Sequence, residues 1–515
     1  MVLKINLNMT NKWLYSFIII GILLFVGTGA YAYVSPLAMG HGGDTVWIKT
    51  SQGVETTLQG AIDAGAFACT VVTGEGLTGR IIRDIAFTGG SSGGSTCVIT
   101  NENITLCAGR NDYFQLGIGD SSHRAKFGLV GGGEGLKNVS KIIGSRSGFY
   151  ALLTDKTVKS WGYNGYGQLG TGDTTDKNLP VSVLDSTGGQ LTNVKSIETR
   201  NPVYAYEHTC AVLNDGTVKC WGYNGYGQLG TGDTTDRSKA TTVSGITNAI
   251  DVKLGGHSSG GYTCALLNDG TVKCWGYNGY GQLGDGTTAS RSSPVVVSGL
   301  TNVKEIYPSK DDYGYTCALL NDGTVKCWGY NGYGQLGTGD TTDRSAPYLI
   351  PSLSGVKKLE LIGAGSFGSV CALLNGGSVK CWGYNGYGRL GVGGDSPSYM
   401  PSLVGGDLAN VVDISGTGWG YEGYYCALIR GGTIKCWGYN GYGQLGDGTT
   451  TTRNFPTSVV GISSAIAIKT GGQNSYEKYT CAILNTGKIN CWGWNGYGGF
   501  GTGNTLSAIL PTEVN

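Results

Sequence analysis

The sequence is poor in charge and in histidine. Only 14% of its 515 residues are charged, and 36 Lys and Arg nearly balance 35 Asp and Glu, so the formal net charge is +1 at pH 7. It has no basic run or stripe to contact phosphates, which nucleic-acid binding requires, and no acidic tail. With only four histidines, no cluster of His, Asp and Glu stands out as an active site. We therefore predict a protein that is not an enzyme, has no cofactor and does not bind nucleic acid.

Glycine is the residue in excess, with 93 copies, and it recurs within a long repeat. Residues 209–237 read TCAVLNDGTVKCWGYNGYGQLGTGDTTDR, and related copies lie at intervals of 53 to 60 residues. A repeat of this length is typical of a solenoid or a propeller, so the glycines are expected in the turns of a folded protein. The Trp-Gly pairs of the copies begin at Trp161, Trp221, Trp275, Trp328, Trp382, Trp437 and Trp492, and a degenerate copy has Ala108 there.

Each repeat contains a pattern typical of a β-hairpin. Between Cys210 and Cys220, two runs of apolar and β-branched residues flank Asn-Asp-Gly, which suits a type I turn followed by a left-handed residue. This loop pairs Val212 with Val218 and places the two cysteines opposite each other in a non-hydrogen-bonded pair. Side chains approach most closely at such pairs, at a separation near that of a disulfide. We therefore predict a disulfide within the hairpin, worth about 2–3 kcal/mol in the chain-entropy model.

The same spacing of ten residues recurs in other copies. The second copy instead has Tyr150 and Ser160, so both cysteines are absent together, as expected for a bonded pair. Buried free thiols are the alternative. A metal site is not expected, because two lone cysteines per repeat without CxxC or histidine do not form a tetrahedral set. Cys69, the fifteenth cysteine, has no partner in this scheme. The predicted pairs are Cys97–Cys107, Cys210–Cys220, Cys264–Cys274, Cys317–Cys327, Cys371–Cys381, Cys426–Cys436 and Cys481–Cys491.

Residues 1–32 have the pattern of a signal peptide or membrane anchor. Two lysines precede an apolar run over 13–26, and Ala-Tyr-Ala ending at Ala32 has the form of a signal-peptidase site. We expect cleavage after Ala32. The alternative is an uncleaved anchor, since the apolar stretch over 13–34 is nearly long enough to span a bilayer. In either case the body is expected to be secreted, periplasmic or on the cell surface, where oxidising conditions agree with paired cysteines.

Residues 33–79 differ from the repeats and are predicted to form a small spacer. Two β-rich runs, 45–50 and 54–57, flank Ser-Gln-Gly and predict a hairpin. Residues 58–64 predict a short helix that ends before Gly65. The repeats then occupy residues 80–515.

Copies of the form TCALLNDGTVKCWGYNGYGQLG resemble the regulator of chromosome condensation repeat. That family forms β-propellers, usually of seven four-stranded blades, so the resemblance implies an all-β closed propeller. Within a repeat, a segment such as 302–306 predicts one strand, the cysteine hairpin two, and a segment such as 293–297 the fourth. The number of copies predicts eight blades and not the usual seven. A final strand over 510–514 placed beside the first copy, which begins at 81–85, would close the ring.

Tyrosines flank the Asn-Gly of most WGYNGYG turns and are the candidate ligand-binding residues. At least one of each pair should be partly exposed, and a ring of tyrosines on one face would suit contact with a protein or a glycan. The alternative is that they pack between neighbouring blades. The candidates are Tyr163, Tyr166, Tyr223, Tyr226, Tyr277, Tyr280, Tyr330, Tyr333, Tyr384, Tyr387, Tyr439 and Tyr442.

Together these features predict an exported, non-enzymatic module that binds another protein or a surface glycan. The resembled family includes a secreted inhibitor of β-lactamase that binds its enzyme, and near-identical repeats suit multivalent contact with a repetitive ligand. Membrane contact is expected only through the N-terminal segment. The alternative function is guanine-nucleotide exchange on a small GTPase, the activity of the family's founding member. The export signal, the paired cysteines and the lack of a basic tail argue against it.

Overall fold

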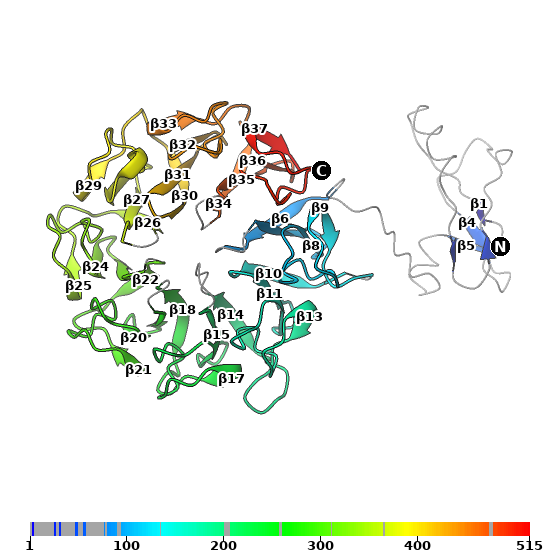
Figure 1. The fold of residues 1–515 in the computed structure, drawn as a ribbon, viewed down its shortest axis with the longest axis horizontal. Coiled ribbons are helices and arrows are strands. Elements are labelled where there is room, and N and C mark those ends of the chain that lie inside the picture. The colour runs from blue at the N-terminus through cyan, green and yellow to red at the C-terminus, as the bar shows by residue number, and fades with distance from the viewer. Residues whose placement is uncertain are drawn as a thin grey trace. The chain divides into compact units, whose positions relative to one another are not determined.

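Eight four-stranded antiparallel sheets, one for each repeat, form a ring in the computed structural model of the protein (Figure 1). The chain divides into two compact units, Met1–Gly74 and Glu75–Asn515, and the ring belongs to the second. Before residue 75 the structure describes only the backbone of short strands. The residues that it describes in full are 77, 80–89, 94–133, 135–199, 206–256, 260–310, 312–363, 366–472 and 477–514.

The first unit contains two small groups of strands. β4 pairs antiparallel with β5, with Ile48 opposite Thr56, in the segment where the sequence predicts a hairpin. Apart from these strands, the signal or anchor over 1–32, the helix expected over 58–64 and Cys69 lie outside the described residues. Among the described residues, no helix has the length and apolar character needed to cross a membrane. The strands are β1 (Leu3–Lys4), β2 (Phe25–Val26), β3 (Ala30–Tyr31), β4 (Trp47–Lys49) and β5 (Glu55–Thr57).

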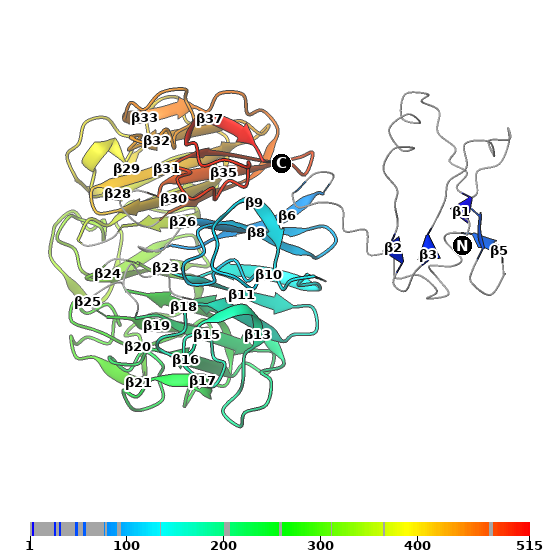
Figure 2. The ribbon, with the colours of Figure 1, turned by 45° about the vertical axis from the view of Figure 1, so that its right-hand side comes forward.

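Each blade of the ring is built from four strands that follow one another along the chain. The first strand of a blade lies nearest the middle of the ring and the fourth lies at its rim (Figures 1 and 2). Blades 1 to 4 consist of β6 (Ile82–Phe87), β7 (Ser95–Thr100), β8 (Thr105–Gly109) and β9 (Arg124–Leu129); β10 (Val139–Gly144), β11 (Gly148–Leu153), β12 (Val158–Gly162) and β13 (Lys177–Ser182); β14 (Val194–Thr199), β15 (His208–Leu213), β16 (Val218–Gly222) and β17 (Arg237–Thr242); β18 (Ala249–Gly255), β19 (Tyr262–Leu267), β20 (Val272–Gly276) and β21 (Arg291–Val296).

Blades 5 to 8 repeat this order, and a single turn of 3-10 helix, η2 (Gly386–Gly388), follows β28. Their strands are β22 (Val303–Pro308), β23 (Tyr315–Leu320), β24 (Val325–Gly329) and β25 (Arg344–Leu349); β26 (Val356–Ile362), β27 (Ser369–Leu374), β28 (Val379–Gly383) and β29 (Ser398–Leu403); β30 (Val411–Trp419), β31 (Glu422–Ile429), β32 (Ile434–Gly438) and β33 (Arg453–Ser458); β34 (Ala465–Gly471), β35 (Tyr479–Leu484), β36 (Ile489–Gly493) and β37 (Ala508–Glu513). The all-β fold and the count of eight blades are confirmed.

The ring closes in a way that the sequence prediction had wrong. The C-terminal strand β37 does not complete the first blade; it pairs with β36 as the rim strand of blade 8, and β9 fills that place in blade 1. Each fourth strand pairs with the third strand of its own repeat after the long loop that holds the WGYNGYG turn, so every blade is complete within its repeat. Blades 8 and 1 instead share an apolar core that includes Val98, Leu106, Tyr479 and Ile483. Figure 2 places them side by side.

The apolar cores lie between blades. The described residues contain eight buried apolar clusters, and each combines side chains of two neighbouring blades. Because successive side chains of a strand point to opposite faces of its sheet, Cys210 and Val212 of β15 pack toward blade 4, whereas Ala211 and Leu213 pack toward blade 2. The second strand of each blade is thus buried on both faces. This explains why its segment TCAVL shows no alternation of apolar and polar residues.

The cysteine pairs predicted from the spacing all form disulfides. In each pair the cysteines are opposite partners in the hairpin register, and their Cα atoms are 4.1 Å apart. Gly216 takes the left-handed conformation that the turn requires, with φ +81°, and Lys156 holds it in blade 2 with φ +67°. In that blade the hydroxyl of Tyr150 donates to the carbonyl of Gln168, and Ser160 Oγ donates to Leu169 O at 2.7 Å. Hydrogen bonds to the following turn thus replace the missing bridge.

Candidate functional site

A buried asparagine builds each WGYNGYG turn. In blade 3, Asn224 Nδ2 donates to the carbonyls of Asp233 and Thr235, both at 3.0 Å, and its Oδ1 accepts the backbone N–H of Leu229 at 2.9 Å. The side chain thereby ties the turn to the GTGDTTD loop that follows it. The equivalent residues are Asn111, Asn164, Asn278, Asn331, Asn440 and Asn495, and Asn385, whose Nδ2 donates to the carbonyl of Gly394.

The acidic residues of the GTGDTTD loop are used within the loop. Asp233 accepts the backbone N–H of Thr235 at 3.0 Å and forms an ion pair with Arg237 at 2.5 Å. The N–H of Thr235 and the charge of Arg237 lower the pKa of the Asp233 carboxyl. Within the described part of the chain, no group of three or more His, Cys, Asp or Glu could hold a metal ion.

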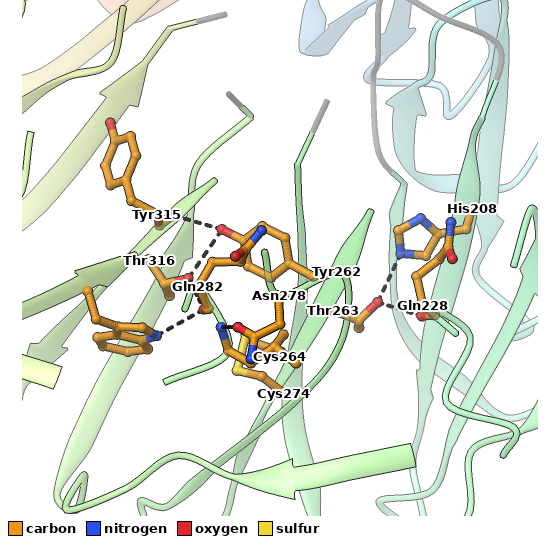
Figure 3. Close-up of a disulfide and its surroundings, with 12 residues drawn as sticks. His208, Gln228, Tyr262, Thr263, Cys264, Cys274, Asn278, Gln282, Tyr315 and Thr316 are labelled. Atoms are coloured by element: carbon orange, nitrogen blue, oxygen red, sulfur yellow. Dashed lines mark hydrogen bonds between the residues drawn. A yellow bond between two sulfur atoms is a disulfide. The ribbon is translucent and has the colours of Figure 1, made fainter. Parts of the chain in front are cut away.

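At six blade junctions a tryptophan donates to the turn of the preceding blade, whereas Trp492 Nε1 has no hydrogen-bond partner among the described residues and blade 1 has Ala108 at the tryptophan position. Figure 3 shows the junction around the Cys264–Cys274 disulfide, where Tyr262 Oη donates to Tyr315 O at 2.7 Å and Thr316 Oγ1 donates to Gln282 O at 3.0 Å. Trp328 Nε1 donates to the same Gln282 carbonyl at 2.9 Å. The turns are therefore held in fixed positions relative to their neighbours. The equivalent tryptophan bonds are Trp161 to Gln115, Trp221 to Gln168, Trp275 to Gln228, Trp382 to Gln335 and Trp437 to Arg389.

The structure places the predicted tyrosines in a belt on one face of the ring. We call this face, which carries the WGYNGYG turns and the loops between first and second strands, the upper face, and the twelve tyrosines the aromatic belt. The second tyrosine of one turn makes edge-to-face contact with the first tyrosine of the next turn. These contacts are Tyr166–Tyr223, Tyr226–Tyr277, Tyr280–Tyr330, Tyr333–Tyr384 and Tyr387–Tyr439, with ring centroids 5.1–5.5 Å apart.

Both interpretations of the tyrosines describe part of this arrangement. Tyr163 contacts Tyr113 of blade 1 at 5.4 Å, and Tyr442 contacts Tyr439 of its own turn at 6.2 Å. The rings pack between blades, yet none of the twelve tyrosines is buried, and Tyr226 and Tyr387 are 38% and 43% exposed. Ligand binding by these residues stays a prediction.

Sequence reasoning missed three aromatic residues that join the belt. Tyr206, Tyr313 and Phe367 come from the loops between first and second strands and lie 4.7–4.8 Å from the tyrosine that begins the turn of their own blade. Each also contacts the last tyrosine of the preceding turn. A signal was present, because each stands four residues before the first cysteine of its repeat.

Blade 6 departs from the repeat in a way that shapes this face. Arg389 replaces the glutamine of GQLG, and its buried guanidinium donates to Phe367 O and Gly420 O, both at 2.9 Å, and to Tyr421 O. It also lies 4.8 Å over the ring of Tyr384. Arg389 thus ties together two loops of the upper face and positions Tyr421, which is 57% exposed and lies tilted against Phe367 with ring centroids 4.3 Å apart.

Several charged groups of the propeller are buried and bonded to neighbouring groups. Lys478 is fully buried 2.9 Å from Glu422, and burial lowers the pKa of its ammonium group although Glu422 opposes the shift. Burial raises the pKa of Glu207, which accepts the backbone N–H of Arg146. A cavity of about 300 Å³ lies among the first strands and is lined by groups such as Glu360.

Comparison with known proteins agrees with the architecture. The family model of the regulator of chromosome condensation (RCC1) repeat matches residues 157–199, 269–307, 322–372 and 432–476, and a second model of the repeat matches 206–228. The ultraviolet-B receptor UVR8 of Arabidopsis thaliana is 28% identical over 309 residues, which are 60% of this chain and 68% of the receptor. The E3 ubiquitin-protein ligase HERC2 of Mus musculus is 29% identical over 364 residues, which are 70% of this chain but only 7% of the ligase.

Among solved structures, Prp20p of Saccharomyces cerevisiae is 18% identical with a TM-score of 0.49, over 78% of this chain and 91% of the yeast chain. Human WBSCR16 is 22% identical with a TM-score of 0.49, over 67% and 86% of the two chains. The recurring WGYNGYGQLG signature, the four-stranded blade that each copy forms and the family matches lead to one conclusion. The chain contains regulator of chromosome condensation repeats, and these repeats fold into a β-propeller of eight blades.

Proposed function

We propose that the protein is a non-enzymatic recognition module that works outside the reducing cytosol and binds a protein or a glycan with its upper face. The observation that carries this proposal is the aromatic belt, in which partly exposed rings are held at fixed positions around the ring. Tyrosine supplies a large contact area with a polar tip at a low cost in conformational entropy. The relative UVR8 is a receptor, and a recognition role for this chain is in line with that.

The seven buried disulfides support the location. Reducing conditions keep most cytosolic thiols unpaired, whereas disulfides persist in secreted, periplasmic and surface proteins. The signal or anchor pattern before residue 33 would deliver the propeller there. Nucleotide exchange on a cytosolic GTPase would require the same chain to work where its bridges are not maintained.

A binding assay on whole cells tests the function. The full chain with its native leader would be recovered from outside the producing cells, labelled, and added back to intact cells and their surface extracts. We expect binding that is lost in the variant Tyr226→Ala/Tyr387→Ala, which removes the two most exposed belt rings. The matched control is Tyr348→Ala/Tyr399→Ala, which removes two rim tyrosines that are each 44% exposed. Equal binding by belt and rim variants, or retention of the chain in the cytosol, would contradict the proposal.

A further inference from the structure

Three places on the upper face carry the same arrangement of three aromatic rings, which we call triads. Each triad combines the last tyrosine of one turn, an aromatic residue from the next blade's loop between first and second strands, and the first tyrosine of that blade's turn. All nine centroid separations within the triads lie between 4.7 and 5.7 Å. The triads are Tyr166, Tyr206 and Tyr223; Tyr280, Tyr313 and Tyr330; and Tyr333, Phe367 and Tyr384.

In each triad, the tyrosine that begins a turn is packed against that turn. The first tyrosine of each turn lies directly on the glycine of its Asn-Gly pair, so a Cβ atom on Gly225 or Gly332 would come within 2.1 Å of the hydroxyl of Tyr223 or Tyr330. The buried asparagine holds the turn from below, and the loop aromatic packs against the ring from one side. Rings fixed in this way lose little further entropy on binding, which favours affinity.

The triads consist of tyrosine and phenylalanine side chains and contain no acidic or basic residue. Burial is the main cause that raises the pKa of Tyr223, and it raises the pKa of Tyr330 to about 12, so both hydroxyls stay protonated and can donate and accept hydrogen bonds. The nearby carboxylate of Asp236 accepts the backbone N–H of Asn224 at 2.7 Å. Arg389, the cation beside the third triad, is fully buried. The triads therefore suit a neutral ligand and offer little attraction to an anion.

Repetition of one site three times indicates a ligand that repeats too. A folded protein without symmetry would present different groups at the three positions, whereas a polymer presents the same unit at each. We propose that the three triads are equivalent subsites for the sugar rings of one neutral polysaccharide, with the aromatic faces packing against the sugar C–H faces and the tyrosine hydroxyls bonding to sugar hydroxyls. This inference rests on the proposed function and names the class of its ligand. Occupying several subsites at once would make the polymer bind more tightly than a short oligosaccharide.

Affinity electrophoresis and calorimetry on the full exported chain test the inference. The probes are dextran, galactomannan and cellohexaose as neutral sugars, alginate as an anionic polysaccharide, and a proline-rich peptide that aromatic grooves also accept. We expect at least one neutral polysaccharide to bind. Tyr206→Ala, Tyr313→Ala and Phe367→Ala should each weaken that binding about 5-fold or more. Because the three substituted residues come from three different blades, their losses should add, and the triple variant should lose about 100-fold or more.

The rim variant Tyr348→Ala/Tyr399→Ala should bind as the wild type does. Near-ultraviolet circular dichroism and intact disulfides would show that each variant is folded, and the conservative Tyr206→Phe should keep most of the affinity. Binding of alginate or the peptide alone, or equal losses in rim and triad variants, would overturn the inference. If no sugar binds while cell-surface binding still depends on Tyr226 and Tyr387, the ligand class is wrong and the recognition function stands. If neither is seen, both are wrong.

Discussion

Removing one disulfide should destabilise the propeller by about 4 kcal/mol. In Cys264→Ala/Cys274→Ala, the unfolded chain is freed from a loop closed by residues ten apart in sequence, which the chain-entropy relation values at about 2.7 kcal/mol. Both cysteines are fully buried between blades 4 and 5. Deleting their two sulfur atoms therefore removes buried contacts worth about 0.8 kcal/mol each, if a sulfur is treated as one methylene-sized group.

Guanidinium unfolding followed by tryptophan fluorescence measures this loss, because Trp275 and Trp328 are fully buried near the bridge. The variant should unfold at a lower guanidinium concentration than the wild type. Cys69→Ala is the matched control and should leave the midpoint unchanged, since Cys69 has no part in the hairpin pairing. A loss of less than about 1 kcal/mol in the double variant would refute the reasoning, because the bridge would then not constrain the unfolded chain.

Three further predictions concern the turn, the blade junction and a buried acid. Trp275→Phe removes the hydrogen bond from Nε1 to Gln228 O and should lower the free energy of unfolding, measured with guanidinium, by about 1–2 kcal/mol. The control Trp419→Phe, at the partly exposed end of β30, should lower it less. Asn224→Asp places a carboxylate against the carbonyls of Asp233 and Thr235 and should lower the free energy of unfolding by about 2–4 kcal/mol at neutral pH. The loss should be smaller at pH 4, where an acid in this position is protonated. Asn321→Asp, at an exposed turn, should cost less than Asn224→Asp. Burial raises the pKa of Glu207 above 4.5, so the folded state binds more protons than the unfolded state, and stability falls as the pH rises above about 4.5. The unfolding midpoint of Glu207→Gln should therefore change less between pH 4 and 7 than that of the wild type. The midpoint of the exposed variant Glu513→Gln should follow the wild type.

Local features of the structure were readable from the sequence. The Asn-Asp-Gly turn and the ten-residue spacing fix the partner of each cysteine within a single hairpin, so Cys210 and Cys220 could be paired without knowledge of the ring. The number of blades follows from counting copies, because each copy folds into one sheet. The role of Asn224 was not foreseen, since the repeat shows only that an asparagine recurs and not that it is buried under the loop.

Features that depend on how blades meet could not be read in the same way. The final strand was predicted to lie beside the first copy, because the sequence does not show whether that strand pairs with β36 or with the first copy. Tyr166, Tyr206 and Tyr223 come together only because the curvature of the ring sets one turn beside the loop of the next blade. Arg389 is a single departure from the repeat, and its partners lie in loops whose positions depend on two blades.

The central claim is that each blade carries its own disulfide and that the ring works outside the reducing cytosol. Peptide mapping without reductant, on protein recovered from outside the cell, tests it most directly. We predict linked peptides that join only cysteines ten residues apart, such as Cys317 with Cys327, and a mature chain that begins after Ala32 or keeps its anchor. Free thiols at these positions, or bridges between different blades, would contradict the claim.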